Sequence, residues 1–338
     1  MTKNTKQLHQ FNTQLCRDIL KSTTYSTKNS LSKDSGLSVA TCFNILTELL
    51  ASNEVLELSL DASSGGRPAR RFCYNKDYAS ALSLYIRKEG TDISVFTLIT
   101  NSIGEEAIQH VYSEPSLNIE SFDKILCSVI NDNPSLMSIA ISIPGIIKNN
   151  IIIDCDIPSL NGYPIKSFIE EKYNIKTVID NDVNIVITGY YRHLIDKNPE
   201  SLCFLYFPKN GLPGMGIIVN GKIIKGFTNS SGEIKHTVTN SDSTDLLTIQ
   251  AKPNLFATYI VELIQSISSI INPEYMIFSG LSFTDSIIYA INQKITKHTL
   301  NQYFPKLIFE DDIHDSLIIG LKHLNQINIK SIHGGQTL

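Results

Sequence analysis

Long apolar runs are absent from the sequence. The longest candidate, Met137–Ile147, is interrupted by serines and a proline, whereas a helix that crosses a bilayer needs about 20 apolar residues. The first ten residues are polar and lack the apolar stretch of a signal peptide. We therefore expect a cytoplasmic protein without a membrane partner.

Cysteine is scarce, and its spacing fits no metal site. The sequence contains no C-x-x-C pair and no short spacing of the kind that zinc ligands show. The cysteines are scattered along the chain at Cys16, Cys42, Cys73, Cys127, Cys155 and Cys203. We therefore predict free, buried thiols.

Charged residues make up only 18% of the 338-residue chain, but their signs are unevenly distributed. Up to Tyr74, nine basic residues stand against six acidic ones, which leaves +3, whereas the remainder carries 20 basic and 27 acidic residues, or −7. A basic module joined to an acidic remainder is typical of a polyanion-binding domain attached to a domain that binds a neutral ligand. The length allows more than one domain.

The first 75 residues have the pattern of a winged helix-turn-helix. An amphipathic first helix is followed by a short helix at Lys28–Ser35 and by a third helix for which Ser38 is the expected N-cap. The residues expected to face the core are Leu8, Phe11, Leu15 and Ile19 in the first helix, and Val39, Phe43, Leu46 and Leu50 in the third. Two strands, Val55–Leu60 and Ala69–Tyr74, then form a hairpin wing.

The outward side chains of this segment suit duplex DNA. The third helix presents Ser38, Ala40, Thr41 and Asn44, which are short side chains able to contact base edges in the major groove. The wing carries Arg67, Arg70 and Arg71, which can enter a minor groove or hold phosphates. The alternative is a packing module whose arginines are only solvated. Because helix spacing, cap and basic wing agree, we predict that residues 1–75 bind a double-stranded DNA operator.

From residue 81 onward, strands alternate with helices, which predicts an α/β fold with covered sheets. The expected strands are Leu82–Ile86, Ile93–Leu98, Ser138–Ile143, Thr177–Ile179, Leu202–Tyr206, Met215–Val219 and Tyr275–Phe278. The expected helices are Ile119–Ile130, Ile165–Tyr173, Val183–Leu194, Leu255–Ile271, Thr284–Ile295 and Asp315–Leu324. A short linker near Asn75–Ser80 joins the two parts.

Six short motifs follow one another along the chain. They are G-G-R-P at Gly65–Pro68, I-P-G-I at Ile143–Ile146, L-N-G-Y-P-I at Leu160–Ile165, D-N-D-V-N at Asp180–Asn184, G-E-I-K-H at Gly232–His236 and I-N-P-E-Y-M-I at Ile271–Ile277. In this order they resemble the motifs of the ROK family (repressor, open reading frame, kinase). The resemblance implies a two-lobed, actin-like (ribonuclease H-like) sugar kinase fold over residues 81–338.

The resemblance also implies a sugar site. Asp182 matches the catalytic base of the family's kinases, Glu233 and His236 match its sugar-holding pair, and Asn161 lies in the loop beside the sugar. Asn181 and Asp182 follow a strand and begin a helix, which is where ligands commonly bind in such sheets. The alternatives are a helix cap for Asp180–Asp182 and an exposed loop pair for Glu233 and His236.

The sequence departs from the family where its kinases handle phosphate. Their first phosphate turn has the pattern D-x-G-G-T, but Leu84–Thr91 has no aspartate and no paired glycines. Their second turn, L-G-T-G-I-G-G, appears as Phe207–Gly216 with two prolines, which cannot donate a backbone N–H. The family's zinc cysteines after His236 are missing, and the segment between Leu247 and Leu255 is shortened. We therefore expect no metal, no cofactor and a pseudokinase.

Together these features predict a DNA-binding transcriptional regulator of sugar metabolism genes, acting as a repressor. Its kinase-like domain would sense a sugar or sugar phosphate, and two-fold operators suggest a homodimer or higher homo-oligomer. One alternative is an active ATP-dependent ROK sugar kinase, which the survival of Asp182 favours. Another is a regulator whose body binds a protein partner, which the shortened ligand region suggests.

Overall fold

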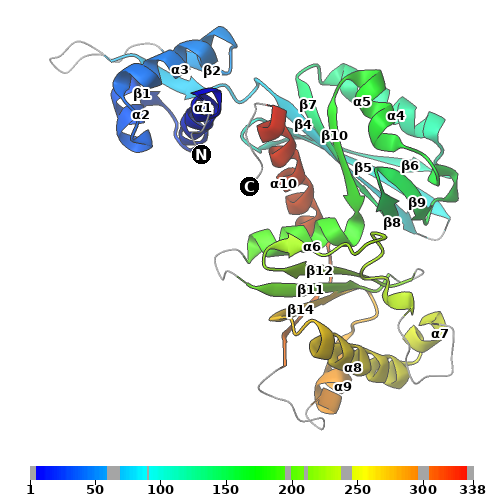
Figure 1. The fold of residues 1–338 in the computed structure, drawn as a ribbon. Coiled ribbons are helices and arrows are strands. Elements are labelled where there is room, and N and C mark those ends of the chain that lie inside the picture. Colours follow the sequence, from blue (N-terminus) through cyan, green and yellow to red (C-terminus); the bar gives the residue numbers. More distant parts are fainter. Residues whose placement is uncertain are drawn as a thin grey trace.

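A computed structural model describes residues 5–58, 69–89, 91–194, 199–208, 212–236, 246–295 and 304–332. A small N-terminal head, formed by residues before Asn75, lies beside a body of two α/β lobes (Figure 1). Within the described residues, no helix is both long and apolar enough to cross a membrane. All six cysteines are free thiols, although Cys127 is exposed and Cys73 is partly buried rather than buried as predicted.

The head contains a helix-turn-helix. Helix α1 (Thr5–Ser22) precedes α2 (Lys28–Ser35) and α3 (Val39–Ala51), and a small sheet has the order β1 (Ser26–Thr27), β3 (Arg71–Tyr74), β2 (Val55–Leu58). Thr27 and Ser30 form a capping box that starts α2, and Gly36, at φ 69°, ends it in the left-handed region that glycine favours. Ser38 caps α3 by accepting a hydrogen bond from the Thr41 N–H, which confirms the predicted N-cap.

The predicted core face of α3 is only half right. Its fully buried residues are Cys42, Ile45, Leu46 and Leu49, each at most 2% exposed. Leu46 is buried and Leu50 packs against the core as predicted, but Val39 and Phe43 are 45% and 50% exposed. Apolar residues occupy more than half of the circumference of this helix, so the 3.6-residue period fits more than one face.

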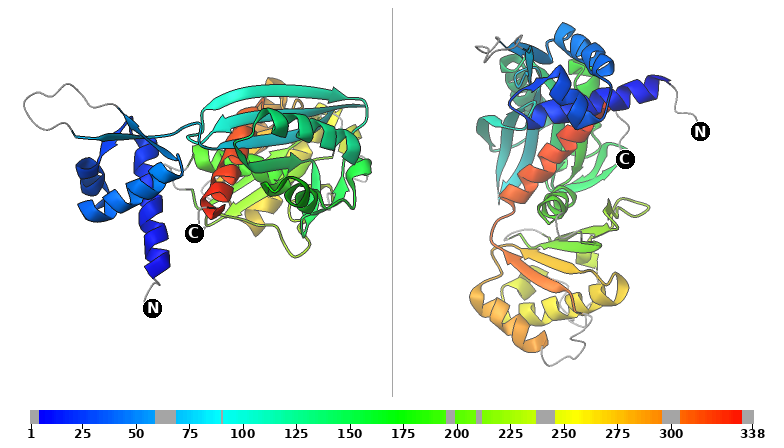
Figure 2. Two further views of the ribbon diagram at one scale, coloured as in Figure 1. Left: turned by 90° about the horizontal axis from the view of Figure 1, so that it is seen from above. Right: turned by 90° about the vertical axis from the view of Figure 1, so that its left-hand side faces the viewer.

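The predicted core face of α1 needs the same kind of correction. Its buried residues are Thr13, Cys16 and Leu20, whereas Leu8 and Phe11 are 50% and 60% exposed. The amino-terminal half of α1 extends beyond the packed part of the head (Figure 2). Its apolar side chains therefore have little of the head's core to pack against.

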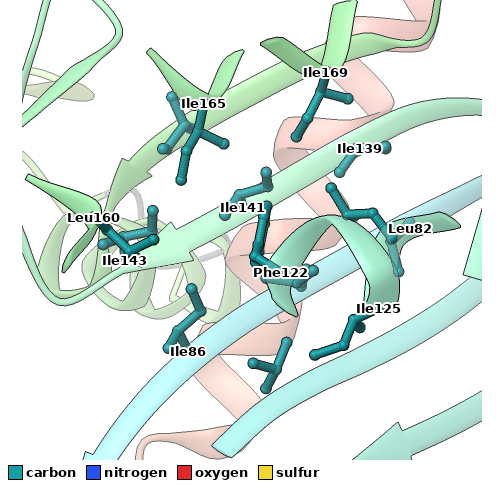
Figure 3. Close-up of a cluster of buried hydrophobic side chains, with 14 of the residues drawn as sticks. Leu82, Ile86, Phe122, Ile125, Ile139, Ile141, Ile143, Leu160, Ile165 and Ile169 are labelled. Atoms are coloured by element: carbon teal, nitrogen blue, oxygen red, sulfur yellow. The ribbon is translucent and has the colours of Figure 1, made fainter. Parts of the chain in front are cut away.

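The first lobe is built on a five-stranded sheet of order β10-β7-β4-β5-β6. Its strands are β4 (Ser80–Glu89), β5 (Asp92–Asn101), β6 (Glu106–Glu114), β7 (Leu136–Ile143) and β10 (Lys176–Asn181). Helices α4 (Ile119–Asp132) and α5 (Ile165–Tyr173) cover one face, where Phe122, Ile141 and Ile165 meet in a dry cluster (Figure 3). The hairpin β8 (Gly145–Lys148) and β9 (Ile151–Cys155) follows β7, and a single 3-10 turn (Pro158–Leu160) follows the hairpin.

The second lobe has a five-stranded sheet of order β13-β12-β11-β14-β15. These strands are β11 (Ser201–Tyr206), β12 (Gly214–Val219), β13 (Lys222–Ile223), β14 (Tyr275–Ser279) and β15 (Lys306–Glu310). Helices α7 (Leu246–Gln250), α8 (Pro253–Ile270) and α9 (Asp285–Ile295) pack on one face. On the other face, α6 (Asp182–His193) lies between the two sheets (Figure 1).

Helix α10 (His314–Ile332) connects all three parts. It packs on α6 and on β4, β7 and β10 of the first lobe. Asn325, which is 2% exposed, is hydrogen-bonded through its Nδ2 to the Leu82 carbonyl at 3.0 Å and through its Oδ1 to the Ser138 hydroxyl at 2.7 Å. Near its end, the Lys330 Nζ lies 3.8 Å from an Asp18 carboxylate oxygen of α1.

The predicted two-lobed α/β body is therefore confirmed, and every predicted strand and helix lies within or overlaps an observed one. The sequence pattern did not predict β6, the β8–β9 hairpin, β13, α7 or β15. Strand β6 is an edge strand exposed on both faces, so it lacks the alternation that marks a half-buried strand. Helix α10 is also longer than the predicted Asp315–Leu324.

Candidate functional site

A cleft of about 700 Å³ lies between the two lobes. From the first lobe it is lined by residues at the carboxyl ends of β4, β7 and β10, and from the second by residues after β11, β14 and β15. Ligands bind at such strand ends in open α/β sheets. Ser142 and Ser279 line the cleft at 1% exposure each, and within the described part of the chain their hydroxyls have no hydrogen-bond partner. Buried polar groups of this kind call for a ligand or water.

The structure brings three of the predicted sugar residues into this cleft: Asn181, Asp182 and Glu233. Asn181 also caps α6, because its side-chain oxygen accepts hydrogen bonds from two backbone N–H groups of the first turn. Its Nδ2 donates to the Gly145 carbonyl at 2.7 Å. The helix-cap alternative therefore describes Asn181 correctly, although the residue still borders the cleft.

Asp182 is a strongly perturbed carboxyl at the cleft. Desolvation, together with the nearby carboxylates of Asp156 and Glu233, raises its pKa from 3.8 to about 7. The hydrogen bond from the Val183 N–H, at 2.8 Å, acts in the opposite direction. A carboxyl that titrates near neutral pH suits a general base, and it can equally donate to or accept from a sugar hydroxyl.

Glu233 is held beside a lysine that the sequence analysis did not consider. Lys235 Nζ lies 3.2 Å from a Glu233 carboxylate oxygen and 3.9 Å from Asp154 across the cleft. Gly232 precedes this pair at φ 94°, and a Cβ there would lie 1.8 Å from the Met215 carbonyl oxygen, so only glycine fits. The motif therefore presents a carboxylate that is already paired with a cation.

Two predicted sugar residues lie elsewhere. Asn161 is exposed after the 3-10 turn at Pro158–Leu160, and His236 is exposed at the end of another short turn, Ile234–His236. Neither lines the cleft. The loop alternative therefore describes the position of His236 better than sugar contact does.

Contacts between the lobes close one side of the cleft. Lys225 Nζ lies 2.5 Å from the Asp180 carboxylate, and Asn229 Nδ2 donates to the Ile147 carbonyl at 2.7 Å. Each contact joins residues at least 45 positions apart in the chain, and no local motif marks them. Sequence reasoning could not have found them.

The phosphate side of the cleft is filled by large side chains. Tyr85 stacks on Phe96 with ring centroids 4.2 Å apart, and its hydroxyl is hydrogen-bonded to His314 Nδ1 at 3.0 Å. The Arg87 guanidinium lies 5.9 Å from the Tyr85 ring centroid. Asp311, Asp312, Pro208 and Pro213 also line this side. Arg87 and Lys88 supply cations here, but the two carboxylates repel a nucleotide phosphate and the two prolines lack the backbone N–H that would donate to it.

The predicted DNA-contacting residues of α3 lie on its surface. Ser38, Ala40 and Asn44 are exposed, and Thr41 is partly buried, with its hydroxyl 2.8 Å from that of Ser38.

On the predicted wing, Arg70 is exposed and forms an ion pair with Glu57 at 3.3 Å. Arg71 lies 4.3 Å over the Tyr25 ring. Arg67 and the hairpin tip fall outside the described residues, so their place relative to α3 stays a prediction.

Several known proteins resemble this chain in sequence. The chain is 27% identical over 230 residues to the xylose repressor of Bacillus spizizenii, a match that covers 66% of this chain and 58% of the repressor. The chain thus spans less than two thirds of the length of such repressors.

Solved structures share the fold. A ROK family transcriptional regulator homologous to the Mlc protein of Escherichia coli superposes with a TM-score of 0.67 at 15% identity, covering 97% of this chain and all of the other. A ROK family protein from Streptococcus pneumoniae, solved with sucrose, gives 0.59 at 16% identity and covers 74% of this chain and 99% of the other. The model of the ROK family matches residues 90–246, so the two-lobed body of this chain contains a ROK family domain.

Proposed function

We propose that the protein is a sugar-responsive transcriptional repressor in which a DNA-binding head, residues 1–75, is controlled by a kinase-like body, residues 81–338. The observation that carries the proposal is the combination of an exposed, capped α3 on the head with a cleft that keeps Asn181, Asp182 and Glu233. Its relatives that are named xylose repressors support the same function.

The cleft has the chemistry of a polyol site. Carboxylates and amides exchange paired hydrogen bonds with adjacent hydroxyls, and the buried hydroxyls of Ser142 and Ser279 offer further donors and acceptors. A ligand that contacts both lobes favours one arrangement of the lobes over the other. It can change DNA affinity only through that difference.

The experiment is fluorescence anisotropy of the full chain with the duplex upstream of its own gene, across a salt series. We expect affinity to fall steeply as salt rises, because phosphate contacts release counterions. The variant Asn44→Ala should weaken binding, whereas Glu120→Ala on the exposed start of α4 serves as a matched control and should not. Absent or salt-independent binding contradicts the proposal.

The effector is tested with D-xylose, D-glucose and their phosphates. A true ligand binds the folded state and raises the unfolding temperature. The same sugar should shift the DNA affinity, and Glu233→Gln should abolish both effects. A sugar that stabilises the protein without changing DNA binding argues against control by the cleft.

A second function, sugar phosphorylation, is favoured by the pKa of about 7 at Asp182. We propose instead that the body is a pseudokinase, because the Tyr85 ring stands in β4, Pro208 and Pro213 remove N–H donors from the turn after β11, and two aspartates line the cleft. A coupled assay of ATP consumption over pentoses and hexoses decides between them. Turnover that disappears in Asp182→Ala would establish the kinase.

A further inference from the structure

The recognition face of α3 carries an exposed apolar pair. Val39 is 45% exposed and Phe43 is 50% exposed. They are four residues apart on one helix, so they lie one above the other on the same face. Ala40 and Asn44, also exposed, continue this face.

The head's own core does not need this pair. That core is completed by other residues of α3, including Cys42 and Ile45 at 0% exposure. Burial of a phenylalanine ring stabilises a protein or a complex, and half of the Phe43 side chain still faces solvent. A partner that covers Val39 and Phe43 would gain this stabilisation.

The surroundings of the pair identify the chemistry of that partner. The Lys28 ammonium lies 4.5 Å from the centre of the Phe43 ring, so a cation borders the apolar patch directly. The acidic residue on the same helix, Glu48, is paired with His9 at 2.9 Å. The recognition face therefore suits a partner with a groove whose edges are anionic and whose floor carries apolar groups.

The major groove of duplex DNA has this composition. Phosphates line its edges, and the apolar groups on its floor are the 5-methyl groups of thymine. The groove admits an α-helix, and asparagine pairs with adenine there through two hydrogen bonds. Adenine is the partner base of thymine, so Asn44 and the apolar pair can read the same short tract.

We propose that Val39 and Phe43 select the operator by packing on thymine methyl groups, with Asn44 reading a neighbouring adenine. The proposal rests on the proposed DNA-binding function and adds the sequence class that the head prefers. Each methyl group that becomes buried contributes about 0.8 kcal/mol, or about a fourfold gain in affinity.

The experiment starts with selection of duplexes from a random library by the full-length protein. Affinity is then measured for the selected duplex and for copies in which one thymine at a time is replaced by deoxyuridine, which lacks only the methyl group. We expect about fourfold weaker binding at two or more positions. In each of the variants Phe43→Ser and Val39→Ser, the loss of the thymine methyl group should no longer weaken binding at one or more of these positions. The salt dependence of DNA binding should stay unchanged.

Leu8→Ser is the matched control, because Leu8 is also 50% exposed but lies on α1. It should keep the full response to deoxyuridine. Wild-type binding that is indifferent to every replacement overturns the proposal while leaving DNA binding in place, and it would assign this face to a protein partner instead. Failure to select any duplex removes both the proposal and the function on which it rests.

Discussion

Helices α6 and α10 cross in close backbone contact, which permits a sharp prediction. A Cβ on Gly189 would lie 1.8 Å from the Ser316 carbonyl oxygen, and one on Gly320 would lie 2.1 Å from that of Ile185. Real Cβ atoms essentially never approach another heavy atom within 3.0 Å. Alanine at either position would therefore force the helices apart by about 1 Å.

The magnitude follows from two opposing contributions. Overpacking a core costs typically about 1–3 kcal/mol, and the upper end applies here because the clash is with backbone rather than with a movable side chain. Alanine gains about 1 kcal/mol over glycine inside a helix. We therefore expect Gly189→Ala and Gly320→Ala each to lower the free energy of unfolding by about 2 kcal/mol. The double variant should lose less than the sum, because the first separation makes room for the second methyl group.

The assay is urea unfolding of the full chain, followed by far-ultraviolet circular dichroism. Ser269→Ala is the control, since it introduces alanine at an exposed position of α8 and should leave the midpoint unchanged or slightly raised. Single variants that are as stable as wild type would show that the two helices do not cross as closely as described, and would refute the reasoning.

Three further outcomes test other contacts. Glu54→Gln neutralises a carboxylate that is 1% exposed and accepts from Arg17 through both of its oxygens, so it should destabilise the head by about 3 kcal/mol, measured by amide hydrogen exchange. Glu57→Gln at an exposed ion pair should change the stability by less than about 0.5 kcal/mol. The pKa of Asp182 is raised on folding from 3.8 to about 7, so its contribution to stability is present below about pH 4 and is lost as pH rises through 7. Asp182→Asn should accordingly flatten the urea midpoint between pH 5 and 8, and parallel profiles would contradict this. Lys225→Met should increase amide hydrogen exchange in the loop that follows β13, because it removes the ion pair with Asp180 of β10. The control Lys222→Met, at an exposed position of β13, should leave that exchange unchanged. Equal protection in the two variants would show that the Lys225–Asp180 contact does not hold the lobes together.

Local signals in the sequence predicted much of the secondary structure. The bounds of α2 and α5 agree with the prediction to the residue, because caps and helix-breaking residues act over a few positions. Leu46 and Leu50 of α3 face the core as predicted, but Val39 and Phe43 do not, because packing against α1 and α2 decides which apolar residues of α3 face inward. Strand β6 was not predicted, because its backbone pairing with β5 makes it a strand and its own sequence lacks an alternating apolar pattern.

The candidate site divides in the same way. Asn181 and Asp182 could be placed at the cleft because they stand at a strand end, which the sequence reveals. Lys235 lies two residues from Glu233 in the same motif, so its position beside that carboxylate was open to prediction. Its contact with Asp154 depends on how the lobes dock and leaves no local pattern. Asn161 and His236 were proposed from motif matching, and the path of their loops leads them to the surface.

Helix α10 gives the molecule a mechanical property. Its first residue, His314, is hydrogen-bonded to Tyr85, which borders the cleft. In its last turns, Lys330 lies close to Asp18 of α1 in the head (Figure 2). A helix of 19 residues is about 28 Å long and behaves as a stiff lever. A tilt of about 5° at the cleft end displaces the opposite end, beside the head, by about 2 Å.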